Sequence, residues 1–247
     1  GLLPTYQAIG IAAPIIMILL RLVQGIGLGG EWGGAILLAV EYAPKDQRGF
    51  YGSVPQMGVT VGMVLATFAL MLVSKLDEAA FLSWGWRVPF VGSVVLVFLG
   101  LWIRKGIDET PVFKKSQNEG KVAKVPLFET FRKHTREVFI AVAVKCVETA
   151  PFYIMAVFVV SYATMQLKMP RADALSAVTI ASIVTTLLIP AMGALSDRIG
   201  RKPVYIGGVL LMIAFAFPYF MLLEKRTYFS LVMATVIGFG VLRHGVG

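Results

Sequence analysis

Apolar residues form seven long runs along this chain, separated by short polar stretches. Each run is close to the roughly 20 residues that an α-helix needs to cross the hydrocarbon core of a bilayer. The runs cover 12–41, 53–74, 86–103, 138–163, 174–196, 203–223 and 228–247. The pattern therefore predicts an all-α fold, a polytopic membrane bundle of seven spans.

Composition agrees with a membrane setting. Hydrophobic residues make up 57% of the 247 positions and charged residues 15%, with a mean hydropathy of +0.77, which is far from the balance of a soluble domain. The formal charge of +9 would fit a nucleic-acid partner only if basic residues gathered on a polar domain, and no segment offers one. The single cysteine, Cys146, lies in an apolar run, so we expect no disulfide, metal or cofactor site.

Basic residues set the orientation of the spans. The loops 44–52, 104–137 and 197–202 hold 2, 9 and 3 Lys and Arg residues. The alternate loops 75–87, 164–173 and 224–227 hold 2 each. By the positive-inside rule the first set is cytoplasmic.

The polar stretch 104–137 divides the chain into 1–103, with three spans, and 138–247, with four. Its Lys, Glu, Gln, Gly and Pro content predicts a flexible or partly helical tether, although a regulatory or partner-binding role stays open. Within it, VPLFETFRKH (125–134) can form a short amphipathic helix at the membrane interface.

Both ends indicate a piece of a longer protein. GLLP (1–4) resembles the tail of an earlier helix, no Met begins the chain, and the last apolar run reaches residue 247. We therefore expect a bundle that is incomplete at both ends. Arg243 and His244 lie in the truncated last run, so no role is assigned to them.

The charged turn GALSDRIGRKP (193–203) separates two apolar runs. Gly200 allows a tight turn of about six residues, and Asp197 is expected to cap the helix that follows. The basic members should face the cytosol and anionic headgroups; they are Arg198, Arg201 and Lys202. Such a turn serves topology alone in many membrane proteins, so a further role needs separate support.

Glycines in the first span recur at a four-residue spacing, at Gly25, Gly29 and Gly33. Small residues at this period let membrane helices approach closely. The spacing predicts a packing face.

Two groups of polar residues fall inside predicted spans. Arg21, Gln24 and Glu31 share one side of the first span. Arg21 and Glu31 are about 15 Å apart along the axis, so each needs a partner from another helix. A charge inside the bilayer costs about 2.5–3.5 kcal/mol on insertion scales. The group therefore indicates a polar cavity, with a fixed ion pair or snorkelling as the alternatives.

Lys145 and Glu148 form the second group, three positions apart on one helical face. Glu148 lies about 16 Å from the start of its span, near the bilayer midplane. Pro151 can loosen the helix beside the pair, and Tyr153 adds aromatic surface. The two charges can also simply neutralise each other. Weaker cavity candidates are Gln56, Thr179, Ser182, Thr185 and Thr186.

These motifs together resemble a known family. GALSDRIGRKP is similar to the loop signature G-x-x-x-D-R-x-G-R-K of the major facilitator superfamily, and RLVQGIGLGGEWGG (21–34) resembles the R-x-x-Q-G-x-G pattern of its fourth helix. The stretches GGEWGGAILLAVEYAPKDQRGFYGSVPQMG, FLSWGWRVPF and DETPVF are similar to its metabolite:proton symporter branch. The resemblance implies a chain that runs from the end of helix three into helix ten of twelve.

The resemblance also implies a function. It predicts a monomeric, proton-coupled symporter of the bacterial inner membrane that imports a small polar metabolite of the citrate, 2-oxoglutarate, shikimate, proline or betaine kind. Gly193, Asp197 and the basic residues of the turn would form a cytoplasmic gate. An acid on the missing first helix would pair with Arg21. A receptor or scaffold of the same fold is the alternative; no constellation for an enzyme is present.

Within this reading the two polar groups divide the work. Arg21 cannot give up its proton at any relevant pH, so Glu31 is the expected proton carrier of the first group. Lys145 is the expected contact for an anionic substrate. We expect Glu31→Gln to uncouple uptake from the pH gradient and Lys145→Ala to weaken substrate binding.

Overall fold

The computed structural model describes residues 2–106 and 126–241; for 126–129 it describes the backbone alone. Over these ranges the chain is helical and contains no strand. Six helical segments are long and apolar enough to cross a membrane. The fold class expected from the sequence is confirmed.

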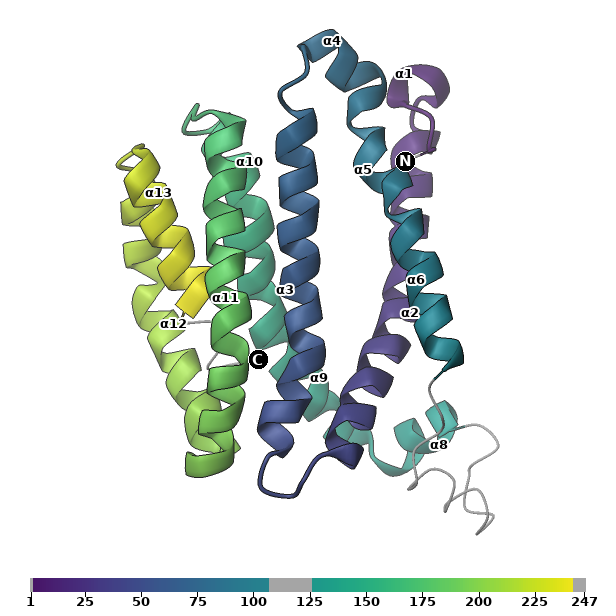
Figure 1. Ribbon diagram of the computed structural model, residues 1–247, viewed down its shortest axis with the longest axis vertical. Helices are drawn as coiled ribbons and strands as arrows, with labels where there is room; N and C mark the ends of the chain where they lie inside the picture. The colour runs from purple at the N-terminus through teal and green to yellow at the C-terminus, as the bar shows by residue number, and fades with distance from the viewer. Residues whose placement is uncertain (1, 107–125, 242–247) are drawn as a thin grey trace.

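The membrane-length segments run antiparallel along one axis (Figure 1). They are α2 (Ala12–Tyr42), α3 (Arg48–Val73), Glu78–Lys105, Thr135–Met165, α11 (Arg171–Ile199) and α12 (Arg201–Leu223). The third comprises α4 (Glu78–Ala80), η1 (Phe81–Gly85), α5 (Arg87–Gly92) and α6 (Val94–Lys105). The fourth comprises α9 (Thr135–Phe152), η2 (Tyr153–Phe158) and α10 (Val159–Met165). Shorter pieces are α1 (Tyr6–Ile9), α8 (Pro126–Lys133), α13 (Tyr228–Thr235) and η3 (Val236–Val241).

Several expected boundaries are wrong. The third span begins at Glu78, eight positions early, and the turn 197–202 shrinks to Gly200 alone, whose φ of 94° only glycine adopts readily. Residues 2–5 lie outside any helix, so the described residues show no tail of an earlier span. The seventh run is helical over Tyr228–Val241, short of a full span, and its end lies outside the described residues, as do Arg243 and His244.

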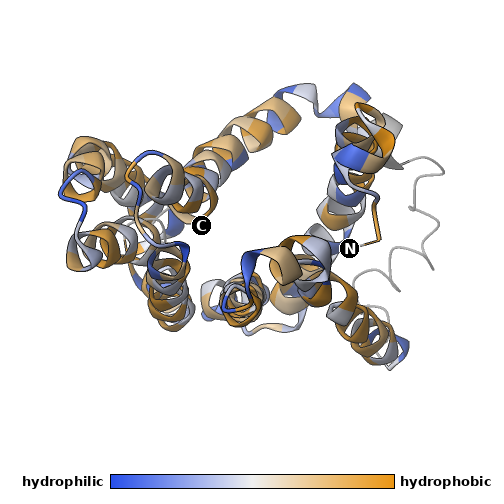
Figure 2. Ribbon diagram, turned by 90° about the horizontal axis from the view of Figure 1, so that it is seen from above, coloured by the Kyte–Doolittle hydropathy of each residue, from blue (hydrophilic) through white to orange (hydrophobic). Residues whose placement is uncertain are grey.

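Burial is uneven across the molecule. The main hydrophobic cluster joins η2, α10, α11, α12, α13 and η3, whereas apolar side chains of α2 and α6 are mostly exposed. Seen along the helix axes, hydrophobic residues dominate the helices (Figure 2). Exposed apolar faces of this extent suit contact with lipid or with further helices.

The helices α3 and α11 pack against each other along their length (Figure 1). Hydroxyl groups pair across them twice: Thr60 with Thr186 at 2.7 Å and Thr67 with Thr179 at 2.8 Å. From the first pair to the second, the residue number rises by seven on α3 and falls by seven on α11. This is the spacing expected of two antiparallel helices that pack in a heptad register. Of the cavity candidates, Thr179 and Thr186 therefore belong to this interface, and the same helix buries Ser182 and Thr185 completely.

The glycine face of α2 has no helix against it in the part of the chain that the structure describes. A Cβ added at Gly25, Gly29 or Gly33 would meet nothing within 4 Å. The packing role expected from their spacing therefore has no partner among these residues.

Candidate functional site

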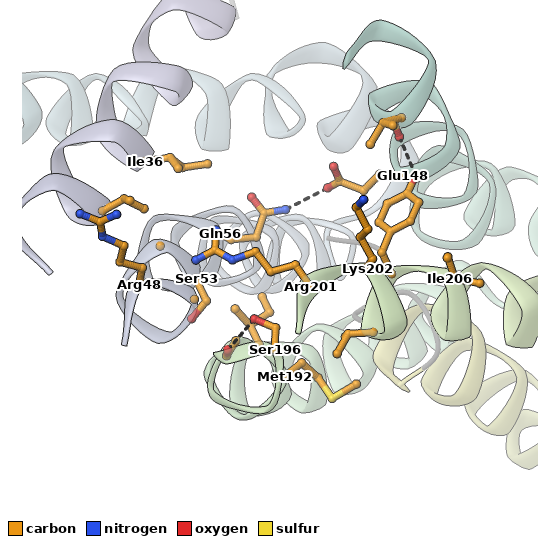
Figure 3. A pocket seen from close by; sticks show the side chains of 18 of the residues that line it. Ile36, Arg48, Ser53, Gln56, Glu148, Met192, Ser196, Arg201, Lys202 and Ile206 are labelled. Carbon is orange, nitrogen blue, oxygen red and sulfur yellow. Dashed lines mark hydrogen bonds between the residues drawn. The ribbon is translucent and has the colours of Figure 1, made fainter. Parts of the chain in front are cut away.

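A cavity of about 660 Å³ opens between α2 and α3 on one side and α9, α11 and α12 on the other (Figure 3). Apolar side chains cover most of its wall. Polar groups gather in two places. Trp32, Gln56, Glu148 and Tyr205 lie deeper in the bundle, and Arg48, Arg201 and Lys202 lie at the helix ends beside the Gly200 turn.

Four side chains close a ring at the deeper end of the cavity. The Trp32 indole N–H donates to Gln56 Oε1 at 3.1 Å, and Gln56 Nε2 donates to Glu148 Oε1 at 3.0 Å. Lys145 Nζ contacts Glu148 Oε2 at 2.5 Å and lies 3.8 Å from the centre of the Trp32 ring. The ring joins α2 and α3 to α9, so segments from either side of the tether 104–137 meet there.

The charged pair within the ring is unequally covered. The Glu148 side chain is 9% exposed and the Lys145 side chain 43%. A buried carboxylate is tolerated when an opposite charge and hydrogen-bond donors surround it, and Glu148 has both. The predicted neighbourhood of Lys145 and Glu148 is confirmed, and α9 presents Glu148 to the cavity.

The aromatic partner expected beside this pair is wrong. Tyr153 is 57% exposed and packs edge-on against Phe152, away from the cavity lining. Pro151 is followed by the π-helical turn η2, which rotates the next residues away from the face of α9 that carries Glu148. Tyr205 of α12 lines the cavity instead, and its hydroxyl donates to the Val144 carbonyl at 3.2 Å.

The charged turn lies at the other end of the cavity. Asp197 accepts hydrogen bonds from the backbone N–H groups of Gly49 at 2.7 Å and Phe50 at 2.9 Å. These are donors of the first turn of α3, which has no cap from its own N-cap side chain. The expectation that Asp197 caps the helix after the turn is wrong, because α12 follows Gly200 with no side-chain cap.

The backbones of α3 and α11 come very close to each other beside the hydrogen bonds that Asp197 accepts from α3. A Cβ on Gly193 would lie 2.6 Å from the Gly49 carbonyl oxygen and 2.9 Å from Ser53 Cβ. Only glycine at both positions lets α3 and α11 approach this closely. The same approach brings the Asp197 carboxylate, whose side chain is 11% exposed, onto the first turn of α3.

The basic residues of the turn take different directions. Arg201 lies 3.9 Å from Asp197, and both Arg201 and Lys202 extend into the cavity (Figure 3). Arg198 is exposed and does not line the cavity. All three are exposed, and the expectation that they face the cytosol and headgroups stays a prediction.

A family model described as the Major Facilitator Superfamily matches residues 1–246. The chain belongs to the major facilitator superfamily. It is 39% identical over 240 residues to a shikimate transporter of Escherichia coli (strain K12), covering 96% of this chain and 55% of that one. It is 41% identical over 221 residues to the inner membrane metabolite transport protein YhjE of the same organism, covering 87% and 50%.

A glycine betaine/proline/ectoine/pipecolic acid transporter of Dickeya dadantii (strain 3937) is 34% identical over 251 residues, covering 96% of this chain and 50% of that one. The chain thus spans about half the length of the curated relatives it matches. No solved structure matches it. This member of the major facilitator superfamily is a multi-pass protein of the inner membrane, and the superfamily consists of transport proteins rather than enzymes.

The first polar group of this superfamily member stays apart from the cavity. Arg21 donates to Gln24 at 3.0 Å on an exposed stretch of α2. Glu31 lies 3.8 Å from Arg104 of α6, with both side chains about two-thirds exposed. The sequence pattern assigned Arg104 to the tether 104–137, so Arg104 was not predicted as the partner of Glu31.

The sequence reasoning missed Trp32, Arg48, Gly49 and Tyr205, which all line the cavity. Trp32 offered a signal, because a lone tryptophan inside GGEWGG stands directly beside the intramembrane Glu31. The other three lie at helix ends or on a partner helix, where periodicity carries no information about contacts.

Proposed function

We propose that this chain is the central part of a proton-coupled secondary transporter, which imports a small polar, carboxylated metabolite by alternating access between two half-bundles. The observation that carries the proposal is the buried Glu148, paired with Lys145 and hydrogen-bonded across the two halves at the end of a cavity. Intramembrane ionisable groups of this kind mark transport pathways by default.

The charge of the cavity favours an anionic solute. Among the described lining residues, Glu148 is the single acid, whereas Arg48, Arg201 and Lys202 are cations. Of these, only Arg201 has a carboxylate within 4 Å in the described chain. A carboxylated metabolite would therefore meet attractive charge along the wall.

Protonation of Glu148 offers a simple coupling step. A proton on its carboxylate removes the charge that holds Lys145, and the ammonium is then available to a substrate carboxylate. Binding of one proton together with one substrate carboxylate leaves the net charge of the site unchanged. We therefore assign proton coupling to Glu148; Glu31, which is more exposed and lies outside the cavity lining, remains the other candidate.

The cytoplasmic latch follows from Asp197. Its bond to the first turn of α3 ties the half that carries α11 to the half that carries α3. A few charge-assisted hydrogen bonds near the membrane surface are strong enough to favour one conformation and weak enough to break in each cycle.

Uptake by the full-length transporter in proteoliposomes, with and without an imposed pH gradient, tests this function. Shikimate and glycine betaine, the solutes named for two relatives, are suitable labelled probes. We expect accumulation of at least one probe that depends on the gradient. No accumulation of either probe under any gradient would favour a receptor or scaffold of the same fold.

Two variants test the assignment of the charged pair. Lys145→Ala should raise KM about tenfold or more, because a charge-assisted contact to the substrate is lost. Glu148→Gln should still bind the probe yet lose the response to the gradient, and Glu31→Gln is the matched comparison. Loss of coupling in Glu31→Gln alone would move the proton site to Glu31.

A further inference from the structure

We propose that Trp32 is the positioning residue for the Lys145–Glu148 pair, acting through two separate parts of its indole. This inference rests on the proposed function and deepens it. Trp32 stands on α2 and the pair on α9, so one side chain of the first half sets the geometry of the charges in the second half.

The N–H group of the indole acts on Glu148 through Gln56. An indole N–H can only donate, so the atom of Gln56 that faces it at 3.1 Å must be the amide oxygen. The amide NH₂ is then turned toward Glu148, where it donates at 3.0 Å. Trp32 in this way supports, from the other side of the amide, the orientation that the acceptor oxygen of Glu148 also requires.

The ring face acts on Lys145. Its ammonium lies 3.8 Å from the ring centre, well within the range of a cation–π contact. Because the N–H is held by Gln56, the ring cannot rotate away without breaking that hydrogen bond. The ammonium is thus kept between the Trp32 face and the Glu148 carboxylate, ready to pass to a substrate carboxylate.

The two parts of the indole can be removed separately. Trp32→Phe keeps an aromatic face for Lys145 and removes the N–H, whereas Trp32→Leu removes both. Gln56→Leu removes the amide that connects the N–H to Glu148. Trp102→Phe is the matched control, because Trp102 lies on α6, is 73% exposed and has no role in the ring.

These variants of the full-length transporter are compared by the KM and kcat of pH-driven uptake, with labelled shikimate and glycine betaine as probes. Trp32→Phe and Gln56→Leu should each lower kcat several-fold with KM nearly unchanged. The double variant should be no slower than either single one, because both remove the same connection. Trp32→Leu should in addition raise KM several-fold, and Trp102→Phe should behave as the native protein.

The inference is wrong if Trp32→Phe and Trp32→Leu have equal KM values. It is also wrong if the kcat of the double variant Trp32→Phe/Gln56→Leu falls by the product of the two single losses. Finally, it is wrong if the Trp32 and Gln56 variants do not differ from Trp102→Phe in kcat or KM. Should Trp32→Leu fail to insert into the membrane, the cycle of Trp32→Phe with Gln56→Leu decides alone. Accumulation of neither probe by the native protein would remove the proposed function, and this role with it.

Discussion

At the scale of single residues, Asp197 does the work of a helix cap for a helix 147 positions away. Both of its oxygens accept from the first turn of α3, where unpaired N–H groups concentrate positive charge. A cap of this kind is worth about 0.5–2 kcal/mol. The contact is therefore large enough to bias two conformations and small enough to be broken.

Asp197→Asn should weaken this latch while keeping a hydrogen-bond acceptor. We expect a several-fold fall in kcat for uptake by the full-length transporter and a much smaller change in KM, since the substrate contacts are untouched. Asp173→Asn, in the first turn of α11, is the control for loss of an acid from the same helix. A change in affinity with an unaltered kcat would remove Asp197 from the gate.

What the sequence could predict at this scale depended on separation along the chain. The contact between Lys145 and Glu148 could be predicted, because residues three positions apart are neighbours on any helix. The contacts of Gln56 with Glu148, 92 positions apart, and of Trp32 with Gln56 and Lys145 could not be predicted, because contacts between different helices depend on how the helices pack. For the same reason Asp197 was assigned to the helix next in sequence, although α3 holds it.

At the scale of elements, the contact of α3 with α11 depends on two glycines at the end of the helices that carries the Gly200 turn. Gly49 and Gly193 bring the two backbones so close that a Cβ on either would overlap the other helix. Backbone cannot give way as a flexible side chain can. The close approach of α3 and α11 at this end therefore requires the absence of side chains at these positions.

Gly193→Ala should force this end of the interface apart. In a Cys146→Ser background, a cysteine placed at Ser53 should then react with a maleimide several-fold faster, because the contact that covers it is opened. Gly207→Ala on α12 is the control, since an added Cβ there meets nothing within 4 Å. Equal labelling rates in both variants would mean that the closed end tolerates a methyl group at Gly193.

The periodicity of the sequence predicted which elements exist more securely than where they end. Apolar runs marked the six spans, but charged residues at the interface can continue a helix, so Arg48 and Arg201 are helical where a loop was expected. Gly200 was predicted as the turn residue because glycine allows a tight turn. This property did not indicate that Gly200 alone would connect α11 to α12.

At the scale of the whole molecule, α2 and α6 leave wide apolar faces uncovered, and the curated relatives are about twice as long. From the family resemblance we expect four helices and most of a fifth outside this chain. Charged residues such as Arg21 would then face lipid rather than a polar cavity.

The 247-residue chain on its own should therefore not transport. We expect no gradient-driven uptake of shikimate or glycine betaine by the purified chain in proteoliposomes, under conditions in which the full-length transporter accumulates a probe. Uptake by the 247-residue chain above that of empty vesicles would contradict the need for the missing helices.

The two hydroxyl pairs between α3 and α11 limit the kind of motion that the halves can make. Sliding one helix along the other by a turn would separate both pairs at once, although each hydroxyl would keep a carbonyl oxygen of its own helix as a partner. A roll of one helix over the other keeps both pairs joined. For the alternating access that we propose, the two threonine pairs therefore favour a rocking of α3 over α11 about this line of contact rather than a slide along it.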